Sequence, residues 1–292
     1  MKSITVTKNG DEKKLSTYIT SVFPKVNINN IYKALRKKDI RVNGKKISEN
    51  ITVHYNDKID IYITDKILNG SPLFNIPIVY EDNNIVIFNK PYGLEVTGEN
   101  SLESIMKKNY EYLKPCHRID INTIGLVIFA KNEESLNILL DKIKKHEIEK
   151  HYIACVYGIP QNETYTTIEA FLFKDRKKSI VYISDIPKKG YVPIKTSYKL
   201  VKKNTSKNLS LLDVTLHTGK THQIRAHLAH IGLPILGDSK YGSFDVNKKY
   251  GLNRQLLCSY SYKFNFETDS GILNYLNGKK INLDKVTFTE YL

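Results

Sequence analysis

The stretch CHRIDINTIGLVIFAKN, residues 116–132, carries a histidine, an arginine and an aspartate within four residues and then becomes apolar. Its second half, GLVIFAK, is a short apolar run with the composition of a buried strand. Asn132 is an expected helix cap, because an Asn side chain accepts backbone N–H groups of a first helical turn, and two glutamates follow it. The sequence therefore predicts that Arg118 and Asp120 lie on a loop at the start of a buried strand, with a helix after that strand.

The rest of the chain after residue 76 alternates between helical and strand-like patterns. Leu136, Leu139, Leu140 and Ile143 have the spacing of one apolar helix face. Two strand-like runs flank a turn at residues 81–84, and further runs of this kind are HYIACVYG (151–158), KTSYKLVKK (195–203), LSLLDVTLH (209–217) and SYKFNF (261–266). The predicted fold class is mixed α/β (α+β), dominated by sheet.

The charge of the chain is strongly positive and unevenly distributed. Its 45 Lys and Arg residues against 30 Asp and Glu leave a net charge of +15. Such an excess favours a polyanionic partner, of which nucleic acid is the commonest. Residues 1–63 hold thirteen of the basic residues against six acids, and the densest cluster is Lys33, Arg36, Lys37, Lys38, Arg41, Lys45 and Lys46.

The basic cluster lies in a segment that predicts a small folded unit. Ile31, Ala34 and Leu35 give a short helix an apolar face, and the helix ends in basic residues. Asn43-Gly44 then predicts a hairpin, since this pair readily adopts the two positive φ angles of a type I′ turn. The alternation in DKIDIYI (57–63) indicates a closing strand, and residues 64–75, with Gly and Pro but no clear period, indicate a linker.

Several classes of protein are not favoured by this sequence. The three cysteines are too few and too scattered for a disulfide framework, and they form no Cys-x-x-Cys pair. The first residues lack the apolar core of a signal peptide, and no apolar run approaches the roughly 20 residues of a membrane span. We therefore expect a cytoplasmic protein without a membrane partner, and a monomer by default.

Four of the eight histidines fall within residues 216–242, so a metal site has to be considered. His217, His222, His227 and His230 lack the spacing of a metal-binding motif, with no cysteine nearby and no suitably placed acid before Asp238. A metal is therefore not expected. The same stretch predicts a helix from an N-cap at Thr221 to His230, with Arg225 on the side of His222, and this helix start would suit an RNA phosphate or a carboxylate.

Several sequence motifs, taken together in their order along the chain, are more informative about function than any one of them. CHRIDINTIGL, KHYIACVYG and HTGKTHQIRAHLAHIGLPILGDSKYG resemble, in that order, the three motifs of RluA-type pseudouridine synthases. VYEDNNIVIFNKPYGLEV and RQLLCSYSYKFNF resemble flanking strands of the same family, and residues 13–63 resemble the S-four RNA-binding domain that often accompanies it. The resemblance implies an RNA-binding domain at 1–63, a linker at 64–75 and a catalytic domain with a central cleft at 76–292.

The resemblance also implies roles for individual residues. Asp120 matches the catalytic aspartate, and Arg118 the arginine that displaces the target base from its stack. Tyr152 matches the tyrosine that packs on the uracil, Arg225 the basic partner that keeps the carboxylate ionised and oriented, and Leu228 an apolar residue lining the uracil pocket. No metal or other cofactor is implied. Attack on C1′ and proton removal at C2′ both stay open as the task of the aspartate.

The substrate is the least determined part of this interpretation. Ile124 and Lys220 depart from the usual family residues beside the site, and their effect on substrate geometry is open. The S-four companion favours large-subunit rRNA by family habit. A tRNA pseudouridine synthase, a non-catalytic RNA-binding ribosome-assembly factor and a histidine-based metal hydrolase are the alternatives.

Overall fold

A computed structural model describes residues 2–24, 26, 28–63, 68 and 76–291, with Asn29 described by its backbone alone. The chain divides into two compact units, Met1–Asn75 and Ile76–Leu292. The segment expected to be a linker, 64–75, lies outside the described residues except for Leu68, which is buried in the core of the first unit.

The first unit packs two helices on a small antiparallel sheet. Its elements are β1 (Lys2–Thr5), η1 (Lys8–Gly10), α1 (Leu15–Val22), α2 (Ile28–Arg36), β2 (Ile40–Val42), β3 (Lys45–Ile47) and β4 (Lys58–Ile61), with strand order β1-β4-β2-β3. The expected hairpin is confirmed, with φ of 50° at Asn43 and 80° at Gly44 between β2 and β3. Ile31, Ala34 and Leu35 are buried, as the apolar face of the helix predicted.

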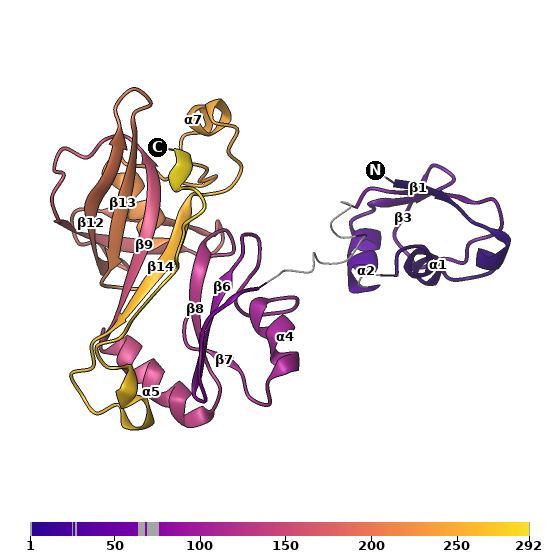
Figure 1. The fold of residues 1–292 in the computed structure, drawn as a ribbon. Coiled ribbons are helices and arrows are strands. Elements are labelled where there is room, and N and C mark those ends of the chain that lie inside the picture. Colours follow the sequence, from indigo (N-terminus) through magenta and orange to yellow (C-terminus); the bar gives the residue numbers. More distant parts are fainter. Residues whose placement is uncertain (1, 25, 27, 64–67, 69–75, 292) are drawn as a thin grey trace. The chain divides into compact units, whose positions relative to one another are not determined.

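The second unit is built around a long, mostly antiparallel sheet. Its strands are β5 (Ile78–Glu81), β6 (Ile85–Lys90), β7 (Lys114–Pro115), β8 (Ile124–Ala130), β9 (Ile148–Tyr157), β10 (Thr166–Asp175), β11 (Ile180–Ser184), β12 (Val192–Asn204), β13 (Leu209–Leu216), β14 (Leu257–Phe264) and β15 (Lys280–Asn282). They follow the order β11-β10-β12-β13-β9-β14-β8-β6-β5, with β7 on β8 and β15 on β14. Figure 1 shows β12, β13, β9 and β14 side by side, with β8 and β6 beyond β14.

Helices and short 3-10 turns cover this sheet. They are α4 (Leu102–Met106), η2 (Lys107–Asn109), α5 (Glu133–Lys144), α6 (Gln223–His230), α7 (Phe244–Lys249), η3 (Gly271–Leu276) and η4 (Thr289–Tyr291). The α6 helix packs against β11 and β12, and α5 against β8 and η3. Among the described residues, no helix combines the length and the apolar character needed to cross a bilayer.

The junction predicted around residues 116–132 is confirmed. The run GLVIFAK, except its final Lys131, falls in β8, whose residues Leu126 to Ala130 are fully buried. Asn132 caps α5, since its Oδ1 accepts the N–H of Ser135 at 2.8 Å. The strands expected at 151–158, 195–203, 209–217 and 261–266 lie within or overlap β9, β12, β13 and β14.

The predicted apolar face of α5 is wrong at one position, Leu140. Leu140 is 45% exposed, whereas Lys142, a residue that the apolar pattern does not include, has no exposed surface. Lys142 Nζ contacts Glu147 Oε2 at 2.8 Å and donates to Thr268 O and Oγ1 at 2.6 Å each. A buried ion pair with two further acceptors compensates the loss of hydration of the ammonium group, so this face of α5 is amphipathic instead of purely apolar.

Candidate active site

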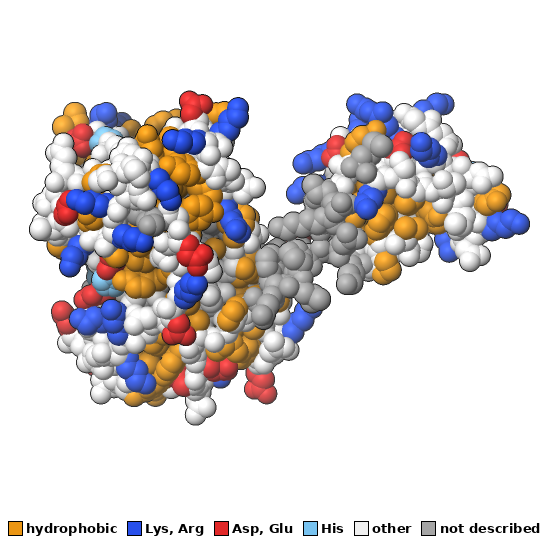
Figure 2. All heavy atoms as spheres, turned by 45° about the horizontal axis from the view of Figure 1, so that its top comes forward, with side chains coloured by type: hydrophobic (Ala, Val, Ile, Leu, Met, Phe, Trp, Pro, Cys, Tyr) orange, Lys and Arg blue, Asp and Glu red, His pale blue; other side chains and the backbone are white. Residues whose placement is uncertain are grey.

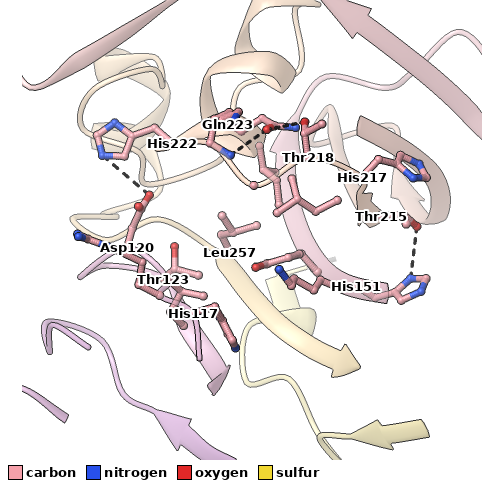
Figure 3. A pocket seen from close by; sticks show the side chains of 18 of the residues that line it. His117, Asp120, Thr123, His151, Thr215, His217, Thr218, His222, Gln223 and Leu257 are labelled. Atoms are coloured by element: carbon pink, nitrogen blue, oxygen red, sulfur yellow. Dashed lines mark hydrogen bonds and ion pairs between the residues drawn. The ribbon is translucent and has the colours of Figure 1, made fainter. Parts of the chain in front are cut away.

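A cleft of about 860 Å³ opens on the second unit. Its walls come from the loop before β8, from β9, from the end of β13 and from the start of α6. Arg118 and Asp120 line this cleft together with Tyr152 and Arg225, which lie far from them in the sequence. Figure 3 shows Asp120 and Thr123 across from His222 and Gln223. The sequence-predicted residues are therefore brought together, with one exception described below.

Arg225 lies between two carboxylates. Its Nη1 donates to Asp120 Oδ2 at 2.9 Å, while Nε and Nη2 donate to the two oxygens of Asp238 at 2.7 and 2.9 Å. The side chain of Asp238 has no exposed surface, whereas that of Asp120 is 25% exposed. Asp238 thus holds the guanidinium from within the core, and Arg225 presents its remaining edge to an aspartate that solvent and ligands can reach.

The surroundings of Arg225 and Asp238 favour the charged form of both side chains. Burial alone would raise the pKa of Asp238, but the bonds from Arg225 and from the N–H groups of Lys240 and Tyr241 lower it below its ordinary value. Burial alone would lower the pKa of Arg225, but its two carboxylate partners raise it. The guanidinium is therefore a fixed cation next to Asp120.

A buried lysine fixes the loop that carries Asp120. Lys90, at the end of β6, is fully buried, and its Nζ donates to the carbonyls of Pro91, Leu94 and Ile121 at 2.9, 2.7 and 3.1 Å. Burial lowers the pKa of Lys90 to about 7, while the attraction of Asp120 acts in the opposite direction. Because Ile121 is the next residue after Asp120, this ammonium group ties the loop to the end of β6.

The other end of the loop is fixed by β8 and β14. Thr123 donates its N–H to Asp120 O at 3.0 Å, and its Oγ1 accepts from Gln255 Nε2 at 2.7 Å. Gly125 has a φ of 107°, and a Cβ there would lie 2.1 Å from Ser259 O. Only glycine permits this approach of the two strands, which pair in parallel, so the start of β8 has one defined position.

The remaining residues that the sequence singled out for this site differ in position. Tyr152, on β9, is 5% exposed and lines the cleft, and Arg118 is exposed at the same cleft. Leu228 is fully buried in α6 and is not among the side chains that line the cleft, whereas Leu257 of β14 is. The side chains of α6 that reach the cleft are Gln223, Ile224 and Arg225.

The expected N-cap of this helix is wrong. The α6 helix begins at Gln223, and its N-cap is His222, which has a left-handed backbone (φ 53°) and makes no side-chain capping bond. Thr221 instead accepts a bond from Lys174 Nζ at 3.1 Å. Gln223 Oε1 accepts the hydroxyl of Thr218 at 2.9 Å and the N–H of Lys220 at 3.1 Å, so this side chain fixes the turn that precedes the helix.

The four neighbouring histidines do not converge. His217 bonds Ser197 Oγ, His227 bonds Thr196 Oγ1, His230 bonds Asp185, and His222 faces Asp120. Within the part of the chain that the structure describes, no group of three His, Cys, Asp or Glu side chains has the arrangement of a metal site. Each histidine has its own partner, and those of His217 and His227 are neighbouring residues of β12.

The basic cluster of the first unit lies on its surface. Of the seven residues, Arg41 is partly buried, with its guanidinium 4.9 Å from the centre of the exposed Tyr62 ring, and the others are exposed. None of the seven forms an ion pair with a carboxylate among the described residues. Figure 2 shows Lys and Arg side chains gathered on this unit, with few acidic ones between them.

Sequence reasoning missed two residues that hold the site together. Asp238 appears in the sequence as a turn residue after Gly237, and Lys90 appears as the last residue of a strand before Pro91. The signal for Lys90 was a charged residue at an otherwise apolar strand end. For Asp238 there was none, because its role depends on a guanidinium thirteen residues away in the sequence.

Comparisons with known proteins identify the family of this chain. The sequence profile of the family "RNA pseudouridylate synthase" matches residues 84–230. A "Ribosomal large subunit pseudouridine synthase C" of Buchnera aphidicola is 31% identical over 89% of this chain and 88% of its own. An "Uncharacterized RNA pseudouridine synthase" of Mycoplasma capricolum is 32% identical over 96% and 97%.

A solved structure shows the same fold. "Human RNA Pseudouridylate Synthase Domain Containing 1" superposes with a TM-score of 0.58, over 67% of this chain and 80% of that one, at 21% identity. The mixed, sheet-dominated fold class is thereby confirmed. The profile match and the relatives that span nearly the whole chain establish that this protein belongs to the RNA pseudouridine synthase family and is an isomerase that forms pseudouridine in RNA.

Proposed function

We propose that this enzyme modifies uridine in large-subunit ribosomal RNA and uses Asp120 as its catalytic carboxylate. The ribosomal substrate is supported by the name of the Buchnera relative, a large-subunit pseudouridine synthase that aligns along most of both chains. A second relative with the same name, from Rickettsia bellii, is 33% identical over 93% of this chain.

The main observation that supports a catalytic role of Asp120 is that its two carboxylate oxygens differ in their hydrogen bonds. Oδ2 is held by Arg225, whereas Oδ1 makes no hydrogen bond within the described residues. The carboxylate is partly exposed and lines the cleft, and Tyr152 lines the same cleft. One oxygen is thus fixed, and the other is available to a substrate.

The reaction needs this combination. The C1′–N1 bond of uridine breaks, a C1′–C5 bond forms, and the hydrogen on C5 is lost while N1 gains one. Because the target base must first leave its stack, which costs a few kcal/mol, a receiving surface and a replacement in the stack both help. The ring of Tyr152 offers the surface, and the exposed guanidinium of Arg118 can occupy the vacated space. The free oxygen of Asp120 then acts at C1′ or C2′.

The first unit supplies affinity for RNA in this proposal. Its basic cluster has the charge and accessibility for phosphate contacts, with six exposed residues and the partly buried Arg41; the members are Lys33, Arg36, Lys37, Lys38, Arg41, Lys45 and Lys46. Arg41 over Tyr62 adds an aromatic surface for a base or a ribose. We therefore assign residues 1–63 as an RNA-binding domain like the S-four domain.

Tritium release tests the proposal directly. Unmodified large-subunit rRNA with 5-tritiated uridine is incubated with the wild type and with Asp120→Asn, and tritium in water is counted. Release by the wild type alone supports both the substrate and the role of Asp120. Release from a tRNA pool but not from rRNA would contradict the substrate, and release by Asp120→Asn would contradict the role of the aspartate.

A further inference from the structure

The side chain of His222 faces the proposed catalytic carboxylate. Its Nε2 lies 4.0 Å from Asp120 Oδ2, and Figure 3 shows the two side chains pointing toward each other across the cleft. The backbone of His222 has a φ of 53°, a left-handed conformation that costs a residue other than glycine roughly 1 kcal/mol or more. Local strain of this kind persists where the surrounding structure requires one side-chain position, and it is frequent at functional sites.

A tyrosine contacts the ring nitrogen of His222 that points away from Asp120. The Oη of Tyr241 accepts the N–H of Val181 at 2.9 Å and lies 2.9 Å from His222 Nδ1. The hydroxyl has one hydrogen, which it can donate to Nδ1 while its oxygen accepts the N–H of Val181. Nδ1 is then the acceptor of a neutral ring, and the ring proton is on Nε2, the atom that faces Asp120.

The surroundings keep the ring neutral. Burial lowers the pKa of His222 below its ordinary value; the carboxylates of Asp120 and Asp238 raise it, and the cations Arg225 and Lys240 lower it further. A neutral ring with its proton on Nε2 is a hydrogen-bond donor that adds no net charge to the site.

We propose that His222 is a positioning residue for Asp120, with its Nε2–H donating to Oδ2 in the RNA-bound enzyme. Oδ2 then has two donors, His222 and Arg225, and the carboxylate is held in the rotation that turns Oδ1 to the uridine. Hydrogen bonds of catalytic groups are often long without substrate and shorten in the complex, so a gap of 4.0 Å fits this role. The inference rests on the proposed role of Asp120.

Two substitutions of His222 separate this role from a purely structural one. In His222→Gln, the side-chain amide nitrogen takes the place of Nε2 and can still reach Asp120. In His222→Asn, the amide nitrogen takes the place of Nδ1 and is too short to reach it. Asn also tolerates left-handed backbone well, so this variant is not expected to lose stability through the backbone.

The expected result concerns kcat more than KM. On RNA from which the wild type releases tritium, His222→Asn should lower kcat by about 10- to 100-fold, the effect of one hydrogen bond to a charged group, with little change in KM. His222→Gln should stay within about threefold of the wild type. His230→Asn is the matched control: His230 lies at the other end of α6 and pairs with Asp185 after β11, so its replacement should leave kcat unchanged.

The outcomes distinguish the inference from the proposed function. Wild-type kcat in His222→Asn, or equal losses in the Asn and Gln variants at an unchanged melting temperature, would overturn the role of His222. Turnover by Asp120→Asn, measured in the same series, would overturn the proposed function instead, and the role of His222 with it. Loss in Asn with retention in Gln supports the inference.

Discussion

Arg225 bonds two carboxylates, Asp120 and Asp238, and replacing each of them by asparagine should affect a different property of the enzyme. Asp238 is fully buried and accepts four bonds, from Arg225 Nε and Nη2 and from the N–H groups of Lys240 and Tyr241. Asp120 is partly exposed and accepts one bond from Arg225. We expect Asp238→Asn to reduce stability and Asp120→Asn to abolish activity.

The size of the stability loss follows from these contacts. In Asp238→Asn the remaining carbonyl oxygen can still accept from Nη2 and from the two backbone N–H groups. The new amide, however, places a donor against Arg225 Nε, where a bond of 2.7 Å is lost. Breaking a buried ion pair costs about 3–5 kcal/mol, and we take about 3 kcal/mol because Arg225 keeps Asp120. In a domain of this size that is a fall in melting temperature of about 6–12 °C.

The matched variant should behave differently. Asn at position 120 keeps an oxygen for Arg225 Nη1 and remains partly in solvent, so its effect on the free energy of unfolding should be below about 1 kcal/mol. Its tritium release should nonetheless be lost. The chain has no tryptophan, so unfolding is best followed by circular dichroism or calorimetry.

The comparison can fail in either direction. Equal melting temperatures for Asp238→Asn and the wild type would refute the view that Asp238 is the buried anchor of Arg225. A melting temperature of Asp120→Asn as low as that of Asp238→Asn would show that Asp120 is a structural member of the pair, and its loss of activity would then say nothing about catalysis.

Three further predictions test other parts of the molecule. Tyr152→Phe should retain activity because the ring is kept, whereas Tyr152→Ala should lose about 10- to 100-fold in kcat/KM through lost stacking; equal loss in both would point to the hydroxyl. His227 is buried, and burial lowers its pKa to about 4, so the unfolded chain binds the proton first and the free energy of unfolding should fall below pH 6.5 by up to about 1.4 kcal/mol per pH unit. Urea denaturation between pH 7 and 4.5 measures this slope, which His227→Gln should reduce. Replacing Lys45 and Lys46 by Gln should weaken RNA binding and flatten its salt dependence in filter-binding titrations, because fewer counterions are released; an unchanged slope would place this part of the basic cluster away from RNA.

The local pattern of this sequence predicts its elements well where one cause dominates. The buried run before Asn132, the Asn43-Gly44 hairpin and the strand pair around residues 81–84 each have a single strong signal, and the structure has all three. The hairpin β10–β11 was not foreseen. In the ladder with β12, exposed and buried residues of β10 alternate only in part, so periodicity gave little to detect.

Tertiary contacts decide what the pattern could not. The N-cap of α6 is His222 instead of Thr221, and the His222 ring contacts Tyr241 and faces Asp120 instead of capping the helix. Lys142 is buried on α5 and Leu140 is exposed, because Glu147 and Thr268 accept hydrogen bonds from the Lys142 ammonium group. The candidate site shows the same limit: the approach of Asp120 to Arg225 depends on a sheet order that local sequence does not encode.

The parallel pairing of β8 with β14 has a consequence for the timing of biosynthesis. The loop with Asp120 is fixed from one side by Gly125 against Ser259, two residues that are synthesised far apart in time. Pairings of such high contact order form late, and a domain folds only when its last strand is available. The basic N-terminal unit has its own core and leaves the ribosome first. With the RNA-binding role proposed for that unit, a nascent chain would bind RNA before it has a cleft, and the capacity to modify that RNA would arise only after β14 has joined the sheet.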